Sequence, residues 1–231
     1  MGYYINYYMD YFLYLLPALI VTIVAQVMVS RTYSKYSKVR SGRGYTGAMA
    51  ARAILDSNGL QNVGIEHISG NLTDHYDPRT NVVRLSDSVY NSDSVAAIGV
   101  AAHEVGHAVQ QNRGYLPMKI RAAIIPATQI GSKIAIPLFF IGLILSFEYL
   151  TTIGIILFSA TVLFQLVTLP VEFNASRRAL QTIEQDHFLE GGEVTGAKKV
   201  LSAAAMTYVA GLLMAIMQLL RLLAIAGRRN D

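Results

Sequence analysis

The chain has 231 residues, of which 53% are hydrophobic and only 15% are charged. This balance is too apolar for an ordinary soluble domain and indicates a membrane protein. The chain contains no cysteine, which excludes disulfides, thiolate metal sites and cysteine nucleophiles. The net charge is only +4, and the basic residues cluster beside apolar segments, so the charge indicates membrane topology and no nucleic-acid partner.

The first apolar segment is an uncharged run of 19 residues, 11–29. At about 1.5 Å per residue, a helix of this length crosses the hydrocarbon core of a bilayer. Five basic residues follow the run within 13 positions and none precedes it. This asymmetry predicts an N-terminus outside the cell and a cytoplasmic domain after the run. Because the run lacks the basic start of a cleaved signal peptide, we expect residues 1–30 to be a retained transmembrane anchor.

The next segment, residues 31–116, is expected to be a cytoplasmic α+β region. Residues 46–58 predict a helix that begins after Thr46 and stops at Gly59. Three strands are expected, and the turn at 77–80 makes the last two a hairpin. They span residues 64–69, 72–76 and 81–86. The strand directly before the following helix is either scaffold or an edge that binds an extended peptide.

The segment HEVGH at residues 103–107 is an HExxH motif. The flanking residues predict a helix that starts after 92–94 and stops near Gly114. Residues four apart lie on one helix face, so His103 and His107 can bind one zinc ion. Glu104 is then placed to take a proton from a zinc-bound water. The alternative is a buried structural helix that carries two histidines by chance.

Residues 117–171 form the second membrane region. The apolar runs 134–146 and 149–171 flank a tight turn, which predicts a transmembrane hairpin. Lys133 either reaches the cytoplasmic edge or belongs to helical turns below the membrane. After a polar segment, residues 200–220 are uncharged and precede three arginines. This run either crosses the membrane, against the positive-inside rule, or packs within the protein or at the interface.

A catalytic zinc usually has three protein ligands, and without cysteine the third is expected to be Asp, Glu or His. Two crossings return the chain to the side of the two histidines, where the first acidic residue is Glu172. Glu172 could instead pair with Arg177 or Arg178. Three rival acids lie further along the chain: Glu184, Glu190 and Glu193.

The sequences HEVGHAVQ and VEFNASRRAL, with the hairpin between them and the apolar C-terminal helix, resemble the YugP-type neutral zinc metallopeptidases of bacterial membranes over nearly the whole chain. More distantly, they are similar to the HtpX and CAAX prenyl protease families. The resemblance implies one Zn²⁺ per chain, bound by His103, His107 and Glu172, with Glu104 as the catalytic carboxylate. It also implies membrane-protein substrates. In those wider families an Asp, four residues after the glutamate, holds a ligand histidine; here Ser176 could do so only without charge.

Some polar residues have roles that the sequence leaves open. A second donor to the oxyanion could come from His187, Arg177, Arg178 or Tyr208, but each is more readily explained as structural or solvated. His67 and His75 lie on the predicted strands, where surface or packing roles are expected.

We therefore expect a mainly α membrane protein with three to four transmembrane helices and a small α+β zincin-like catalytic region. It would be multi-pass, with a cytoplasmic active site that hydrolyses peptides or membrane proteins through a zinc-activated water. A zinc-binding scaffold or chaperone without turnover is the alternative, although it has no use for Glu104. A transporter would need ionisable residues in the apolar runs, which carry almost none. No oligomeric state is indicated.

The expected segments are the anchor at 1–30, the α+β region at 31–116, the hairpin at 117–171, the third-ligand helix at 172–199 and the C-terminal apolar helix with its basic tail at 200–231.

Overall fold

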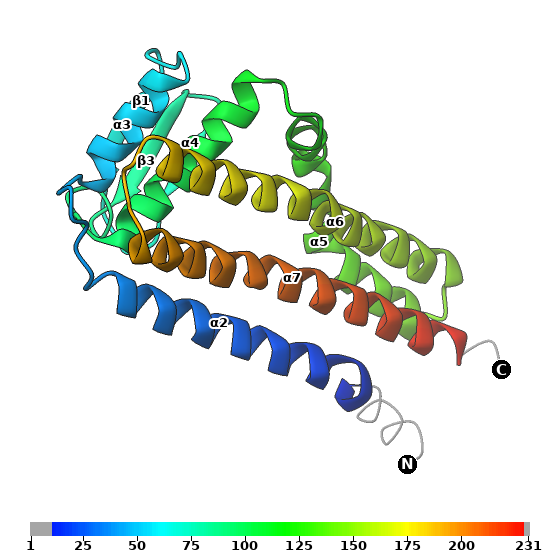
Figure 1. Cartoon of the computed structure of the whole chain (residues 1–231). Helices are drawn as coiled ribbons and strands as arrows, with labels where there is room; N and C mark the ends of the chain where they lie inside the picture. The colour runs from blue at the N-terminus through cyan, green and yellow to red at the C-terminus, as the bar shows by residue number, and fades with distance from the viewer. Residues whose placement is uncertain (1–10, 229–231) are drawn as a thin grey trace. The chain divides into compact units, whose positions relative to one another are not determined.

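The computed structural model describes residues 11–228, which are mostly helical and include one small sheet (Figure 1). The expected mainly α fold is therefore confirmed. In chain order the elements are a π-helical turn η1 (Tyr11–Leu15), α2 (Leu16–Tyr36), α3 (Gly47–Ser57), β1 (Gly64–Ile68), β2 (His75–Asp77), β3 (Val82–Ser86), α4 (Val95–Asn112), α5 (Leu116–Ile144), α6 (Glu148–Gln185) and α7 (Gly192–Gly227).

Four helices, α2, α5, α6 and α7, are long and apolar enough to cross a membrane. Helix α5 begins 17 residues before Lys133, so this exposed lysine lies inside the helix and not at its start. Helix α6 continues without a break through Pro170, which places Glu172 on the same helix as the second apolar run of the hairpin. Helix α7 likewise includes the whole apolar run 200–220.

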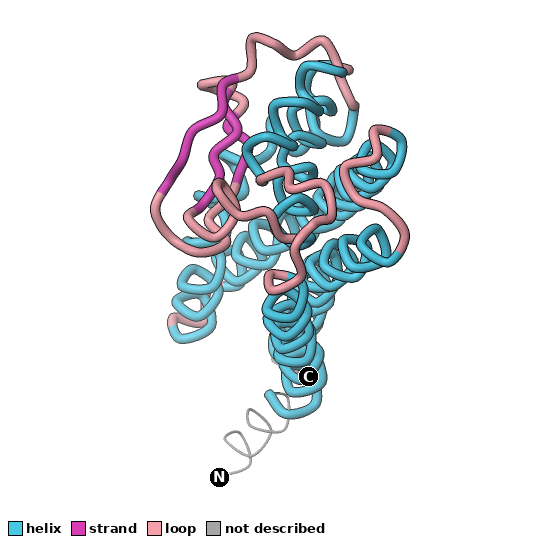
Figure 2. Tube along the Cα trace, turned by 60° about the vertical axis from the view of Figure 1, so that its left-hand side comes forward, coloured by secondary structure: helices cyan, strands magenta, loops and turns pink. Residues whose placement is uncertain are grey.

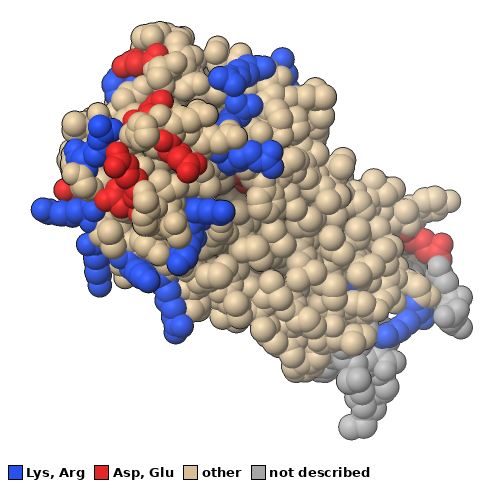
Figure 3. All heavy atoms as spheres, in the orientation of Figure 1, with Lys and Arg blue, Asp and Glu red and all other residues tan. Residues whose placement is uncertain are grey.

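The described chain divides into two compact units. The sheet unit comprises residues 27–118 and 170–206, and the apolar unit comprises the remaining described residues. Each long helix contributes residues to both units. On the face in Figure 3, the charged side chains gather mostly on the sheet unit, whereas the surface of the apolar unit is largely uncharged.

The sheet has the strand order β1-β3-β2 (Figure 2). Strand β1 pairs with β3 in parallel and β2 pairs with β3 antiparallel, so the predicted hairpin is confirmed. The hypothesis that the strand directly before the HEVGH helix is an edge was wrong, because β3 lies in the centre. A parallel neighbour, β1, occupies the side that a simple meander would have left open, and β2 is the edge on the other side.

Capping residues set the ends of the two helices that pack with the sheet. The Thr46 side chain accepts a hydrogen bond from the Met49 N–H at the start of α3, and Ser94 does the same for Ala97 in α4. Gly59 and Gly114 follow the two helices in left-handed conformations, as the sequence predicted. The core of this unit then forms from α3, α4, β3, the last part of α6, the segment after it and the start of α7. Its largest fully buried members are Leu55, Leu85, Ile98, Ile183 and Leu189.

Helices α4 and α6 approach each other closely at Gly106. A Cβ atom added at this glycine would lie 2.9 Å from the carbonyl oxygen of Ala175. Backbone atoms cannot yield as a flexible side chain can, so only glycine permits this spacing. Gly99, on the same helix, is less confined, because its added Cβ would be 3.5 Å from the Ala197 Cβ.

We expect Gly106→Ala to destabilise the protein, because overpacking against backbone typically costs about 1–3 kcal/mol. That exceeds the gain of about 1 kcal/mol from replacing glycine by alanine within a helix. Gly99→Ala is the matched control and should be neutral or stabilising. Circular dichroism melting of both variants in detergent measures the difference. Equal melting temperatures for the two variants would contradict the proposed backbone contact.

Candidate metal centre

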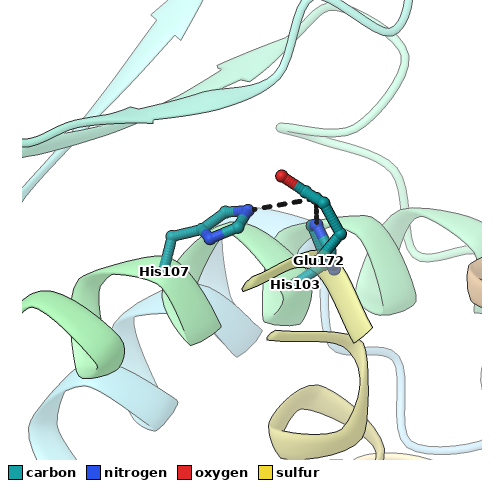
Figure 4. Close-up of side chains that lie close together, drawn as sticks. All are labelled: His103, His107 and Glu172. Carbon is teal, nitrogen blue, oxygen red and sulfur yellow. Dashed lines mark hydrogen bonds and ion pairs between the residues drawn. The ribbon is translucent and has the colours of Figure 1, made fainter. Parts of the chain in front are cut away.

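Three potential metal ligands converge where α4 meets α6. His103 and His107 lie on one face of α4, and Glu172 reaches them from α6 (Figure 4). One ligand atom from each residue lies within 4.8 Å of the others. The two imidazole rings are nearly perpendicular, at 84°, with centroids 4.8 Å apart. Within residues 11–228, no other group of three His, Asp or Glu side chains comes together in this way.

The donor set and its spacing fit a zinc ion. Glu172 Oε2 lies 3.3 Å from His103 Nε2 and 3.6 Å from His107 Nε2. Ligands bound tetrahedrally to zinc at about 2.0–2.1 Å lie about 3.3–3.5 Å from one another. Two imidazoles and one carboxylate are also a ligand set typical of catalytic zinc sites, which keep a fourth position open.

Gln110 orients His107. Its amide nitrogen donates to the backbone carbonyl of Val171, at 2.8 Å, and to Asn174 Oδ1, at 3.0 Å. The amide oxygen must therefore face His107 Nδ1, which lies 3.0 Å away and donates the proton. This tautomer leaves the His107 Nε2 lone pair free for a metal ion. Gln110 is fully buried, and the sequence analysis did not assign it a role. Its position three residues after His107, on the same helix face, was the available signal.

Ser176 holds the other histidine. Its hydroxyl oxygen lies 3.1 Å from His103 Nδ1, so a proton on Nδ1 again leaves Nε2 directed at Glu172. The serine thus contacts one of the two histidines of the HEVGH segment. It does so without a negative charge.

The electrostatics favour a cation at this point. Glu172 is only 2% exposed, and an isolated buried carboxylate is costly. Burial lowers the pKa of His107, but the hydrogen bond and charge of Glu172, together with the charge of Glu104, outweigh burial and leave the pKa raised. The same two carboxylates would stabilise a divalent metal ion between the imidazoles.

Glu104 lies next to the three donors but is not one of them. Its Oε2 accepts a hydrogen bond of 3.0 Å from the backbone N–H of Tyr76 on β2. That N–H therefore points away from β3, which is on the other side of the strand. The outer edge of β2 consequently faces the catalytic side of α4, which the sequence had not predicted.

The other sequence candidates have partners elsewhere. Glu193 accepts from the N–H groups of Gly42 and Glu190, and it joins no metal group. Arg178 bonds to Asn174. Neither Glu184 nor Glu190 is part of the three-ligand group, and Tyr208 belongs to the apolar unit.

The remaining histidines have local contacts. His67 pairs with Asp87 at 2.7 Å, and His75 Nδ1 lies 2.9 Å from the Thr73 carbonyl oxygen. His187 has a left-handed backbone, and its carbonyl oxygen accepts from Arg43. These contacts agree with the surface and packing roles expected for His67 and His75.

Comparison with known proteins is consistent with this geometry. Residues 11–227 match the family model described as "Putative neutral zinc metallopeptidase". The chain is 50% identical over 207 residues to "Putative membrane protease YugP" of Bacillus subtilis (strain 168), covering 90% of this chain and 92% of that protein. No solved structure matches the chain. On the family model and this identity, the chain belongs to the neutral zinc metallopeptidase family.

Proposed function

We propose that this chain is a membrane-embedded zinc metalloendopeptidase in which His103, His107 and Glu172 bind one zinc ion and Glu104 is the catalytic base. One observation carries the proposal. The Glu172 carboxylate lies at the spacing of a zinc ligand from one nitrogen of each histidine, and a second carboxylate, Glu104, lies beside these donors and accepts from the Tyr76 N–H. The short sheet packed with the HEVGH helix supports a zincin-like arrangement of this region.

Bound zinc would polarise the scissile carbonyl and lower the pKa of a water molecule. Glu104 then takes the water proton as the nucleophile attacks and later gives it to the leaving amine. Gln110, whose amide oxygen can only accept, keeps the His107 proton on Nδ1, and Ser176 orients the His103 ring through its contact with Nδ1. The buried position of Glu172 prevents it from rotating into solvent between turnovers.

The edge of β2 is the proposed site for the substrate backbone. An extended peptide that pairs with an exposed edge gains main-chain hydrogen bonds and needs little side-chain specificity. The Tyr76 N–H lies on this edge, hydrogen-bonded to Glu104, so a peptide paired there would pass directly by the catalytic carboxylate.

For the membrane arrangement we propose the five segments expected from the sequence, with the lipid bilayer as a partner and a cytoplasmic active site. The support is the cluster of basic residues after the first apolar run and the continuity of α6 from an apolar run to Glu172. Membrane proteins, or chain segments close to the inner leaflet, are then the proposed substrates. A scaffold without turnover would share the metal site but would have no role for Glu104.

We expect Glu104→Gln to lower proteolysis at least about a hundredfold, because glutamine cannot accept the proton. The variant should keep one zinc per chain, since Glu104 is not a proposed ligand. Glu172→Gln should lose the zinc, whereas Glu184→Gln serves as the control on the same helix. Metal content by mass spectrometry and cleavage of an unfolded membrane-protein panel are the measurements. Cleavage by Glu104→Gln at the parental rate would exclude the mechanism.

We expect Gln110→Met to weaken zinc binding about tenfold to a hundredfold, because it removes the partner that orients a ligand histidine. Methionine has a similar volume, so the effect does not arise from a cavity. Gln111→Met changes the exposed neighbouring residue and is the control. Competition with a chromogenic chelator measures both affinities. If both variants bind zinc as the parent does, Gln110 does not orient His107.

Cysteine labelling tests the orientation, because the chain has no native cysteine. Arg79→Cys, at a site that is 91% exposed in the β2–β3 turn, should resist an impermeant thiol reagent in intact cells and react after lysis. Phe147→Cys, between α5 and α6, should react in intact cells, as should Gly2→Cys, which lies outside the described residues. The reverse pattern would place the active site outside the cell.

A further inference from the structure

A second site lies between the C-terminal part of α2 and the N-terminal part of α7. These segments line an open cavity of about 660 Å³, and all of its lining residues belong to the sheet unit. Helix α2 contributes positions 28, 31, 32, 35 and 36, and α7 contributes positions 195, 198, 199, 202, 203 and 206. Both sets repeat every three to four residues, so each helix presents one face.

The cavity is strongly basic. Four of its lining residues are cations, Arg31, Lys35, Lys198 and Lys199, and none is acidic. Among the ion pairs between described residues, none includes any of these four. Lys35 Nζ lies over the Tyr36 ring, 5.4 Å from its centroid. Four like charges around one hollow repel each other, and an anion between them would relieve this repulsion.

The cavity also changes from apolar to basic along both helices. Met28 precedes the basic residues of α2, and Met206 follows those of α7, with Thr32, Thr195 and Ser202 among the cations. Each helix is a candidate membrane span. The uncharged run of α2 ends directly before Arg31, and the run of α7 begins directly after Lys199. Basic side chains at such positions meet the head-group layer of a bilayer.

Figure 3 shows Lys and Arg side chains gathered over the end of α2 and the beginning of α7. The close approach of the two helices beyond the basic residues depends on Gly196. A Cβ there would lie 2.7 Å from the Tyr36 ring. Tyr36 thus packs against Gly196 at the polar end of the cavity, and the two methionines lie toward its apolar end.

We propose that this cavity binds the head group of an anionic phospholipid. The phosphodiester would lie among the four cations, the three hydroxyl groups would donate to its oxygens, and the acyl chains would pass along Met28 and Met206. A zwitterionic lipid would bring its own cation into the basic cavity and bind less well. The proposal does not depend on the proteolytic function, since none of these residues belongs to the metal centre.

Native mass spectrometry of the full chain in detergent tests this site. The probes are dimyristoyl phosphatidylglycerol and dimyristoyl phosphatidylcholine, which differ only in the head group. We expect the parent to bind phosphatidylglycerol preferentially. Lys198→Gln combined with Lys199→Gln should weaken that binding about 25-fold, because each basic residue near anionic lipid contributes on the order of fivefold.

The control is Lys119→Gln combined with Lys133→Gln, which removes the same charge from another candidate membrane helix and should change binding less than twofold. Lys198→Arg combined with Lys199→Arg keeps the charge and should keep the lipid, which separates charge from misfolding. Four results would overturn the proposal: unchanged binding in the glutamine variant, an equal loss in the control, displacement of the lipid by excess inorganic phosphate, or equal binding of phosphatidylcholine. A loss of oligomers instead of lipid adducts would indicate that a second copy of the chain covers the cavity.

Discussion

The contact between α4 and α6 determines the chemistry of the sheet unit. A carboxylate that is almost completely buried, Glu172, meets two imidazoles from the neighbouring helix. Burial raises the energetic cost of any misplacement, because the carboxylate cannot turn to water for compensation. The helices can approach this closely only because Gly106 lacks a Cβ that would strike the backbone of Ala175. The packing of α4 on α6 and the convergence of the three proposed metal ligands therefore depend on the same short distance between the two helices.

Polar side chains that contact the two histidines also stabilise the contact between α4 and α6. Gln110 connects the backbone of Val171 and the side chain of Asn174 on α6 to His107 on α4. Because the Gln110 amide nitrogen donates to both of these α6 groups, the amide oxygen is the atom that faces His107 Nδ1. An amide oxygen can only accept, so His107 carries its proton on Nδ1. Ser176 makes the corresponding contact to His103 from α6. Each histidine is thus oriented by a residue that also joins the two helices.

The distribution of charge separates two kinds of chemistry within the sheet unit. The metal centre combines two carboxylates, Glu104 and Glu172, with two imidazoles, and attracts a cation. The cavity between α2 and α7 contains four cations and no acid, and attracts an anion. A protease that acts beside a bilayer needs both a polar reaction site and a defined position at the lipid head groups. The second requirement is consistent with basic residues that follow directly on apolar runs.

Local rules account for what the sequence alone determined. The i, i+4 spacing placed His103 and His107 on one helix face, and capping residues set the limits of α3 and α4. Apolar runs indicated three to four membrane helices, and they lie within the four candidate helices of the structure, although the sequence left open whether residues 200–220 cross. The sequence also indicated Glu172, the first acid after the hairpin, as the third metal ligand, but it left Glu184, Glu190 and Glu193 as alternatives. Only the distance of Glu172 to the histidines distinguishes it from them.

Contacts between residues distant in the sequence were decided only by the tertiary structure. Strand order was one of them: β1 inserts beside β3 in parallel, which makes β2 the edge that faces Glu104. The bonds from Gln110 to α6 span 61 and 64 residues and leave no periodic signal in the sequence. The basic cavity combines positions 28–36 with 195–206, which come together where Tyr36 packs against Gly196. Sequence periodicity describes one element at a time, whereas these features arise from which faces pack against each other.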